Sequence, residues 1–462
     1  MMSQRNLADR DASRMMLIVV LSVLLVLVAI SLRCTTAHAQ TAAEPKLDRG
    51  QRAAIIDSVT ATLNSDYVYP DVAKQMEKLV RQYLKQGKYD TLTDPIAFTM
   101  KLTEDLRSVS KDRHLGVRYF PDLATMFTPG DTLTDSAKVA EAERARLDNY
   151  GFYKVERLPG NIGYIDFRRF ASADVAGPTA VAAMNFLGNV DAIIFDLRQN
   201  GGGDATMIQL LSSYLFGEQK HLNSFYFRPH DTIHQTWTLP YVPGRHMSNV
   251  DVYVLTSSFT FSGAEEFTYN LKNLKRATII GETTGGGAHP VEDHAFLHMN
   301  IQLRVPFGRA INPVTNANWE GVGVKPDIEV PAAQALAVAR IEALKKLRDR
   351  VTDPDRKRML AWDLEGEEAE QHPVTVDPAT MQKYAGTFGP RKILFENGAL
   401  FYQREGRPKF KLVPLSTTVF RLDSPDTNYF RLKFVANERG EVTEVVGLYD
   451  DGREERSPRS GS

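Results

Sequence analysis

Apolar residues recur at helical spacing in two stretches near the start of the chain, residues 52–84 and 94–109. Within the first stretch, Ile55, Val59 and Leu63 are spaced so that they share one face of an α-helix. This spacing predicts a helical N-terminal domain over residues 45–120. The next stretch, residues 121–155, is polar and too short for another domain of ordinary size, so it predicts a connector with one helix.

From Gly160 onwards the pattern changes to short β-rich runs that alternate with helical spacing. Strands are expected at residues 162–167, 192–196, 252–255 and 277–281, and helices at residues 175–187, 206–216 and 264–274. Such alternation is typical of an α/β core, which we place at residues 156–345. An alternating run at residues 296–306 predicts one further strand, and residues 332–350 predict an amphipathic helix.

The last part of the chain has the pattern of a separate unit. Residues 363–378 are acidic and contain Pro373, which indicates a linker. Beyond them, two β-rich runs flank Asn397-Gly398, a dipeptide typical of a tight hairpin. Further runs of the same kind predict a small all-β module over residues 379–454.

Residues 1–39 have the composition of a signal peptide or membrane anchor. Three arginines precede an apolar run at residues 15–32, and small residues follow it up to Ala39. The run is near the lower limit for crossing a bilayer, so both a cleaved signal and an uncleaved anchor fit it. Either one predicts a periplasmic or extracellular protein. The single cysteine, Cys34, lies in this segment, so a processed chain forms no disulfide.

The overall charge excludes one class of partner. The formal net charge is -1 and the isoelectric point is near 6.8. This balance gives no electrostatic reason to expect binding to nucleic acid or to an anionic membrane surface.

Ser262 lies where a buried strand leads through a turn into a helix, within residues 252–270. At a helix start, the helix field favours an alkoxide, and the Gly263 amide points to where an oxyanion would form. The same serine fits a plain helix cap, because Ser is a preferred N-cap residue and Glu265 would complete a capping box. From this segment alone, nucleophile and cap both remain open.

A second strand-to-helix turn, within residues 191–204, contains three consecutive glycines that end at Gly203. Glycine lets the backbone approach a ligand closely, and such a turn can present an amide to a phosphate or to a tetrahedral intermediate. The turn lacks the lysine of a phosphate loop and the spacing of a dinucleotide-binding motif, which argues against nucleotides. A simple tight turn is the alternative interpretation.

A serine nucleophile needs a base, and His114 stands out among the ten histidines, at the end of the predicted helical domain. His289, His294 and His298, with acidic residues between them, offer a different chemistry, that of a metal-dependent hydrolase. Their spacing matches no common ligand motif, and the alternating pattern around them predicts a strand. We therefore predict no metal site.

Four motifs, in this order and spacing, resemble those of the C-terminal-processing serine peptidase family, in the branch of the interphotoreceptor retinoid-binding protein and the tricorn protease core. The motifs are FDLRQNGGG, TSSFTFSGAEEF, GETTGGGAHP and WEGVGVKPD, within a resemblance that spans residues 50–345. The resemblance implies a crotonase-like and ClpP-like spiral ββα core.

The resemblance also implies a role for each matched residue. Ser262 corresponds to the nucleophile, His114 to the base and Glu320 to the carboxylate that orients the base, while the amides of Gly203 and Gly263 correspond to the oxyanion hole. The lysine of the Ser-Lys branch is replaced here by Gly287. Two features depart from the pattern: Arg113 stands where the branch has a serine before the histidine, and the connector has no room for a PDZ module.

Taken together, the resemblance implies an exported serine-type endopeptidase that hydrolyses polypeptides through an acyl-enzyme, with no metal or organic cofactor. The alternative is a non-catalytic protein that binds apolar ligands, because the retinoid-binding relatives use this fold in that way. The presence of Ser262, His114, Glu320 and both glycine turns in one chain favours the peptidase.

Overall fold

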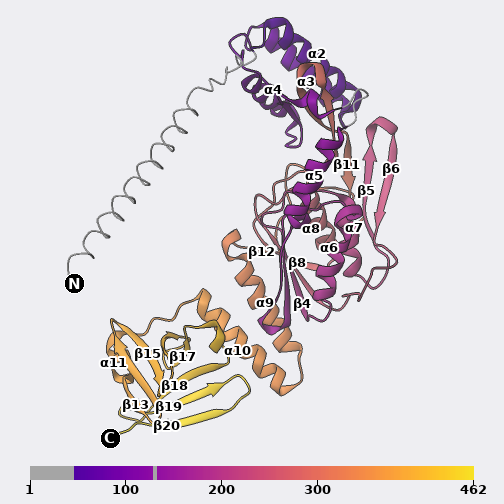
Figure 1. The fold of residues 1–462 in the computed structure, drawn as a ribbon. Coiled ribbons are helices and arrows are strands. Elements are labelled where there is room, and N and C mark those ends of the chain that lie inside the picture. The colour runs from indigo at the N-terminus through magenta and orange to yellow at the C-terminus, as the bar shows by residue number, and fades with distance from the viewer. Residues whose placement is uncertain (1–45, 128–132, 462) are drawn as a thin grey trace, which may run out of the picture.

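The computed structural model describes residues 46–127 and 133–461 (Figure 1). The predicted signal peptide or anchor at residues 1–39 lies outside the described residues. Within them, no helix combines the length and apolar character needed to cross a membrane.

The N-terminal domain consists of three helices, α2 (Arg49–Asp66), α3 (Pro70–Lys85) and α4 (Pro95–Ser110). Helix α2 begins after Asp48, whose side chain accepts a hydrogen bond from the Gln51 amide at 2.7 Å. The predicted apolar face is buried against the other two helices. The chain then enters strand β1 (Gly116–Tyr119).

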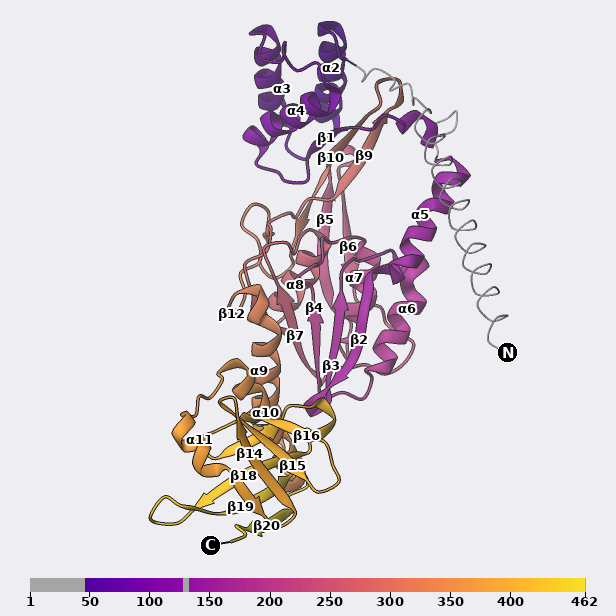
Figure 2. The same cartoon turned by 60° about the vertical axis from the view of Figure 1, so that its left-hand side comes forward.

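A long hairpin from the core completes this N-terminal domain. Strand β1 pairs with β10 (Ile301–Pro306), which pairs in turn with β9 (Val291–Phe296). Figure 2 shows the hairpin of β9 and β10 extending from the core to the helices. The single strand predicted at residues 296–306 is wrong at its start, because Phe296 ends β9 and Asn300, with φ of 55°, closes the turn.

The core is a six-stranded sheet, in which five strands are parallel and β2 is antiparallel at one edge. Its order is β12 (Ile328–Glu329), β8 (Ala277–Gly281), β7 (Asp251–Thr256), β4 (Ala192–Asp196), β3 (Ile162–Phe167) and β2 (Phe152–Leu158). The α/β class and the four expected strands are confirmed.

Helices cover both faces of this sheet. One face packs against α6 (Ala173–Phe186), α7 (Ala205–Tyr214) and α8 (Gly263–Asn273). The other packs against α9 (Ala335–Arg350) and α10 (Pro354–Gln371). A small antiparallel sheet of β11 (Gly308–Ile311), β5 (His221–Phe227) and β6 (Thr232–Trp237) stands beside the core. Because parallel strands carry the core, the turns that follow β4 and β7 lie at the same edge of the sheet.

Two connecting segments complete the core. The connector contains α5 (Asp135–Leu147), the one helix that the sequence predicts there. The linker predicted at residues 363–378 begins too early, because α10 continues to Gln371. In α10, Leu360 and Leu364 are buried at helical spacing against the core. This burial stabilises the helix although its C-terminal half is acidic.

The C-terminal module follows α11 (Pro378–Tyr384) and is one antiparallel sheet in which strands pair in chain order. Its predicted hairpin at Asn397-Gly398 is present, with both residues at positive φ, as a tight primed turn requires. The strands are β13 (Gly386–Phe388), β14 (Arg391–Glu396), β15 (Ala399–Arg404), β16 (Lys409–Pro414), β17 (Val419–Leu422), β18 (Phe430–Ala436), β19 (Val442–Tyr449) and β20 (Glu454–Pro458).

Candidate active site

Ser262 occupies the junction between β7 and α8, as the N-cap residue of α8. Its backbone has φ of 54° and ψ of -122°, a conformation that costs free energy in a residue other than glycine. The Ser262 amide donates a hydrogen bond to Glu265 Oε2 at 2.9 Å, which holds the turn in place. The sequence placed Ser262 at a helix start, and the structure adds that its backbone is strained.

The glycine turn after β4 lies directly against Ser262. Gly202 and Gly203 have φ of +101° and +142°, and a Cβ atom added to Gly202 would stand 2.6 Å from the Gly263 nitrogen. A Cβ atom added to Gly263 would stand 2.9 Å from the Gly203 nitrogen. The two predicted oxyanion amides, those of Gly203 and Gly263, are therefore neighbours, and neither donates to another group in the described part of the chain.

Glu265 fastens a third loop to this pair of turns. Its buried carboxylate accepts hydrogen bonds from the amides of Gly286 at 2.7 Å and Gly287 at 2.8 Å, and from the Thr284 hydroxyl. Burial raises the pKa of Glu265, although these hydrogen bonds oppose the shift. The loop that carries Gly287 and His289 is thus held beside Ser262.

His114 is buried beside the same loop. Its ring centroid lies 4.6 Å from that of Phe261, the residue before Ser262, and a Cβ atom on Gly287 would stand 2.6 Å from the ring. Burial lowers the pKa of His114 to about 4, although the Asp112 carboxylate opposes this shift. Neither ring nitrogen has a hydrogen-bond partner among the described residues. Arg113, which replaces the serine of the related branch, donates to the Gly285 carbonyl at 2.6 Å.

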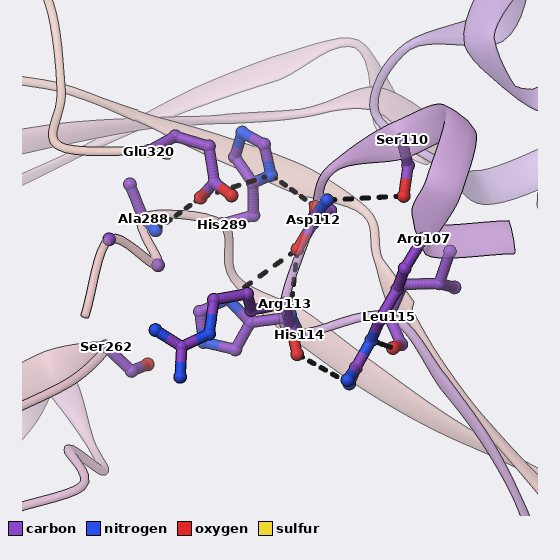
Figure 3. A network of polar contacts seen from close by, with 12 residues as sticks. Arg107, Ser110, Asp112, Arg113, His114, Leu115, Ser262, Ala288, His289 and Glu320 are labelled. Carbon is purple, nitrogen blue, oxygen red and sulfur yellow. Dashed lines mark hydrogen bonds and ion pairs between the residues drawn. The ribbon is translucent and has the colours of Figure 1, made fainter. Parts of the chain in front are cut away.

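Asp112 is the carboxylate beside His114, and Glu320 has no hydrogen bond or ion pair to His114 in the described residues (Figure 3). Asp112 Oδ1 accepts the His114 amide at 2.9 Å and lies 3.9 Å from His114 Nδ1. Asp112 Oδ2 lies 2.6 Å from His289 Nδ1. Glu320 Oε2 accepts the Ala288 amide at 2.6 Å and lies 3.6 Å from His289 Nδ1. The resemblance implies that Glu320 orients His114, and no hydrogen bond or ion pair joins the two side chains in the described residues.

The two carboxyl groups of this cluster have opposite pKa shifts. Burial and the charge of Asp112 raise the pKa of Glu320 to about 7. Burial also opposes ionisation of Asp112, but the hydrogen bond from His289 and the nearby charges of His289 and His114 outweigh it and lower the pKa of Asp112. Asp112 is therefore the carboxyl group that stays ionised at neutral pH.

Asp112, His289 and Glu320 are also the group of three potential metal ligands in the described part of the chain. Two ligands at about 2.1 Å from a tetrahedral ion lie roughly 3.4 Å apart, which is farther than the 2.6 Å between Asp112 and His289. These atoms thus form a hydrogen bond, and the geometry does not fit a metal site. The alternative ligands His294 and His298 lie outside this group, on β9 and in the turn after it.

A cleft of about 360 Å³ opens beside Ser262. Its walls include the two glycines predicted for the oxyanion hole, together with apolar and aromatic residues of the kind that bind side chains. The residues of the cleft that bear on chemistry or binding are Gly203, Ser262, Gly263, His289, Phe225, Phe227 and Trp319.

Three features of the site were not predicted from the sequence: Asp112, the hydrogen bonds that Glu265 accepts from the loop of Gly286 and Gly287, and the contact of His289 with Asp112. The only local signal for Asp112 is its position two residues before His114, where its side chain can reach the His114 amide. The loop of His289 lies far along the chain, so no spacing could have placed it there.

Two family models match the chain. Residues 161–330 match peptidase family S41, and residues 46–147 match the N-terminal domain of peptidase S41 in eukaryotic IRBP. The first stretch contains Ser262, Glu320 and both glycine turns, and the second contains Asp112 and His114.

Several solved structures of proteases are similar to parts of this chain. The structure of mature CPAF is similar over 66% of this chain and 99% of that chain, with 13% identity and a TM-score of 0.47. The photosystem II D1 C-terminal processing protease is similar over 61% and 93%, with 15% identity and a TM-score of 0.38. An S41 protease structure from Bacteroides fragilis is similar over 48% of this chain and 58% of that chain, with 18% identity and a TM-score of 0.37. Over residues 46–147 and 161–330, this chain belongs to peptidase family S41.

Proposed function

We propose that the protein is an exported serine peptidase that cleaves polypeptides through an acyl-enzyme. The observation that carries the proposal is the strained Ser262 at the start of α8, with the amides of Gly203 and Gly263 beside it. Two amides that face the same point as a serine oxygen are the arrangement that stabilises a tetrahedral oxyanion. Export is proposed from the composition of residues 1–39.

In the proposed reaction, the Ser262 oxygen attacks a peptide carbonyl and its proton passes to His114. The pKa of His114, lowered by burial to about 4, leaves the ring neutral at neutral pH, and its nitrogens have no hydrogen-bond partner among the described residues, so one of them can accept the proton. The Gly203 and Gly263 amides donate to the oxyanion. The carbon–nitrogen bond then breaks, His114 returns the proton to the leaving amine, and water hydrolyses the ester in a second cycle of the same kind.

The experiment compares the full-length protein with Ser262→Ala in two assays, cleavage of an unfolded protein and labelling by a serine-directed fluorophosphonate. We expect Ser262→Ala to abolish labelling and to reduce cleavage by roughly 10⁴-fold or more. Ser258→Ala is the matched control, because Ser258 is an exposed serine in the same turn, and its amide and hydroxyl both contact Glu282.

Two other outcomes would count against the proposal. A folded parent that neither cleaves nor labels would favour the binding of apolar ligands instead. Cleavage that survives Ser262→Ala but stops with a chelator would favour a metal-dependent hydrolase. Under the proposed mechanism, a chelator has no effect on cleavage.

A further inference from the structure

The side chain of Asp112 stands between two histidines. It is 1% exposed, and each of its oxygens has a separate partner. Oxygen Oδ1 faces the amide and the Nδ1 atom of His114, and Oδ2 faces His289 Nδ1. Because Nδ1 of His114 faces Asp112, the opposite nitrogen, Nε2, is left for the proton of a nucleophile. At 3.9 Å the Asp112 carboxylate and His114 Nδ1 are not hydrogen-bonded, but a carboxylate on that side of the imidazole is the order found in a serine peptidase triad.

Glu320 contacts His289 and the Ala288 amide rather than His114. Its Oε2 atom accepts the Ala288 amide and faces His289, while Oε1 is buried without a partner in the described residues. Glu320 thus contacts His289, His289 contacts Asp112, and Asp112 is the carboxylate that faces His114. A carboxyl group in that place can hold His289 but cannot by itself align His114.

We propose that Asp112, and not Glu320, is the positioning residue that aligns His114 for proton transfer, and that Glu320 positions His289 against the far side of Asp112. The inference rests on the proposed serine peptidase function. When His114 accepts the proton of Ser262, a positive charge forms in a buried place, and the nearest carboxylate stabilises it. Asp112 is that carboxylate, and His289 satisfies its other oxygen.

The first test measures the titration of His114 itself by NMR, and so does not depend on activity. The charged and titratable groups that act on the His114 ring are Asp112, His289, Arg304 and Arg107. Among these, Asp112 raises the pKa of His114 and the other three lower it. We expect Asp112→Asn to lower the pKa of His114 below its parent value and Glu320→Gln to leave it unchanged. The reverse result would overturn the proposal.

The second test measures the rate of fluorophosphonate labelling of Ser262 against pH in the same variants. Asparagine is nearly isosteric and can still accept the His114 amide, so Asp112→Asn should fold. We expect labelling to fall by roughly 10³–10⁴-fold, with the acidic limb of the profile shifted to lower pH. Glu320→Gln should label at least about a hundred times faster than Asp112→Asn. A purely structural role of Asp112 would lower the rate without moving the limb.

The labelling rates of Asp112→Asn and Glu320→Gln decide between the two carboxyl groups. Equal or greater loss in Glu320→Gln would assign the alignment of His114 to Glu320 and overturn the proposal. Asp112→Asn could fail to fold. In that case, a folded Glu320→Gln protein that labels more than about a hundredfold more slowly than the parent would also overturn the proposal. A parent that does not label at all would refute the peptidase function, while the NMR titration would still decide which carboxyl group acts on His114.

Discussion

At the scale of single residues, the distance between two turns depends on having no side chain at Gly202. A Cβ atom there would stand 2.6 Å from the Gly263 nitrogen and 2.7 Å from the Phe261 carbonyl oxygen, in a backbone with φ of +101°. At the neighbouring Gly201, a Cβ atom would meet nothing within 4 Å. Alanine at Gly202 and alanine at Gly201 therefore form a matched pair. The first disturbs the contact with Gly263, and the second tests whether the turn accepts a side chain at all.

We therefore expect Gly202→Ala to push the glycine turn away from Ser262. Strain and overlap should lower the free energy of unfolding by about 2–4 kcal/mol, and labelling should fall by roughly 10²-fold or more as the oxyanion amides move apart. Gly201→Ala should change both quantities little. Denaturant unfolding and fluorophosphonate labelling measure the two effects, and equal behaviour of the two variants would contradict the assignment.

The raised pKa of Glu320 should affect how the free energy of unfolding depends on pH. A carboxyl group whose pKa rises from 4.5 to about 7 on folding favours the folded state when it is protonated. Its contribution is complete below pH 4.5 and is lost as the pH rises through 7. Glutamine at position 320 cannot ionise, so Glu320→Gln should not show this loss of stability at high pH. The loss amounts to at most about 3 kcal/mol. From pH 4.5 to pH 8, the change in unfolding free energy should therefore be more positive in Glu320→Gln than in the parent.

Local chemistry made part of this site predictable from sequence. Ser262 and Gly203 each stand in a strand-to-helix turn, and both turns were expected because strand, turn and helix signals occur close together in the chain. The contact of Asp112 with His289 joins residues far apart in sequence, so it depends on how the loops pack. The role of Glu320 came from a family pattern, and the structure shows that Asp112 is the carboxylate nearer to His114.

At the scale of elements, the hairpin of β9 and β10 connects the two parts of the candidate site. It pairs with β1, two residues after His114, and it begins just after His289. The sequence predicted one strand here, because Leu297 and Met299 alternate with His298 and Asn300, so the alternating pattern continues through the turn. The prediction of a linker from residue 363 was also wrong at its start. It rested on the acidic composition, whereas α10 continues through these residues and its buried side carries Leu360 and Leu364.

Leu303 tests the coupling between this hairpin and the helical domain. It is fully buried among the helices, while its neighbour Gln302 is half-buried on the other face of β10. We expect Leu303→Ala to lower the free energy of unfolding by about 2–5 kcal/mol. Labelling of Ser262 should also slow, because β1 carries the segment of His114. Gln302→Ala, the matched control, should change stability by less than about 1 kcal/mol.

At the scale of the whole molecule, helix α10 joins the core to the C-terminal module. On one side, Arg356 donates to the Gly160 carbonyl at 2.8 Å and to Asp191 at 3.0 Å. On the other side, the Trp362 indole donates to the Asn428 carbonyl at 2.7 Å, and the Arg431 guanidinium stacks 3.7 Å from the Trp362 ring. The module has its own apolar core, separate from the clusters around Ser262 and His114.

Arg431 is the residue through which this attachment can be weakened without touching the candidate site. It is buried on β18, and burial lowers its pKa to about 10, so it stays charged at neutral pH and pairs with Glu365 on α10. Arg431→Ala should cost roughly 2–4 kcal/mol through the lost ion pair and cation–π contact. Hydrogen exchange should then accelerate in β18, while labelling of Ser262 stays within about twofold, because no residue of the module lines the cleft. Arg439→Ala, on the exposed turn between β18 and β19, is the control. A large loss of labelling in a folded Arg431→Ala protein would show that the module acts on the active site through α10.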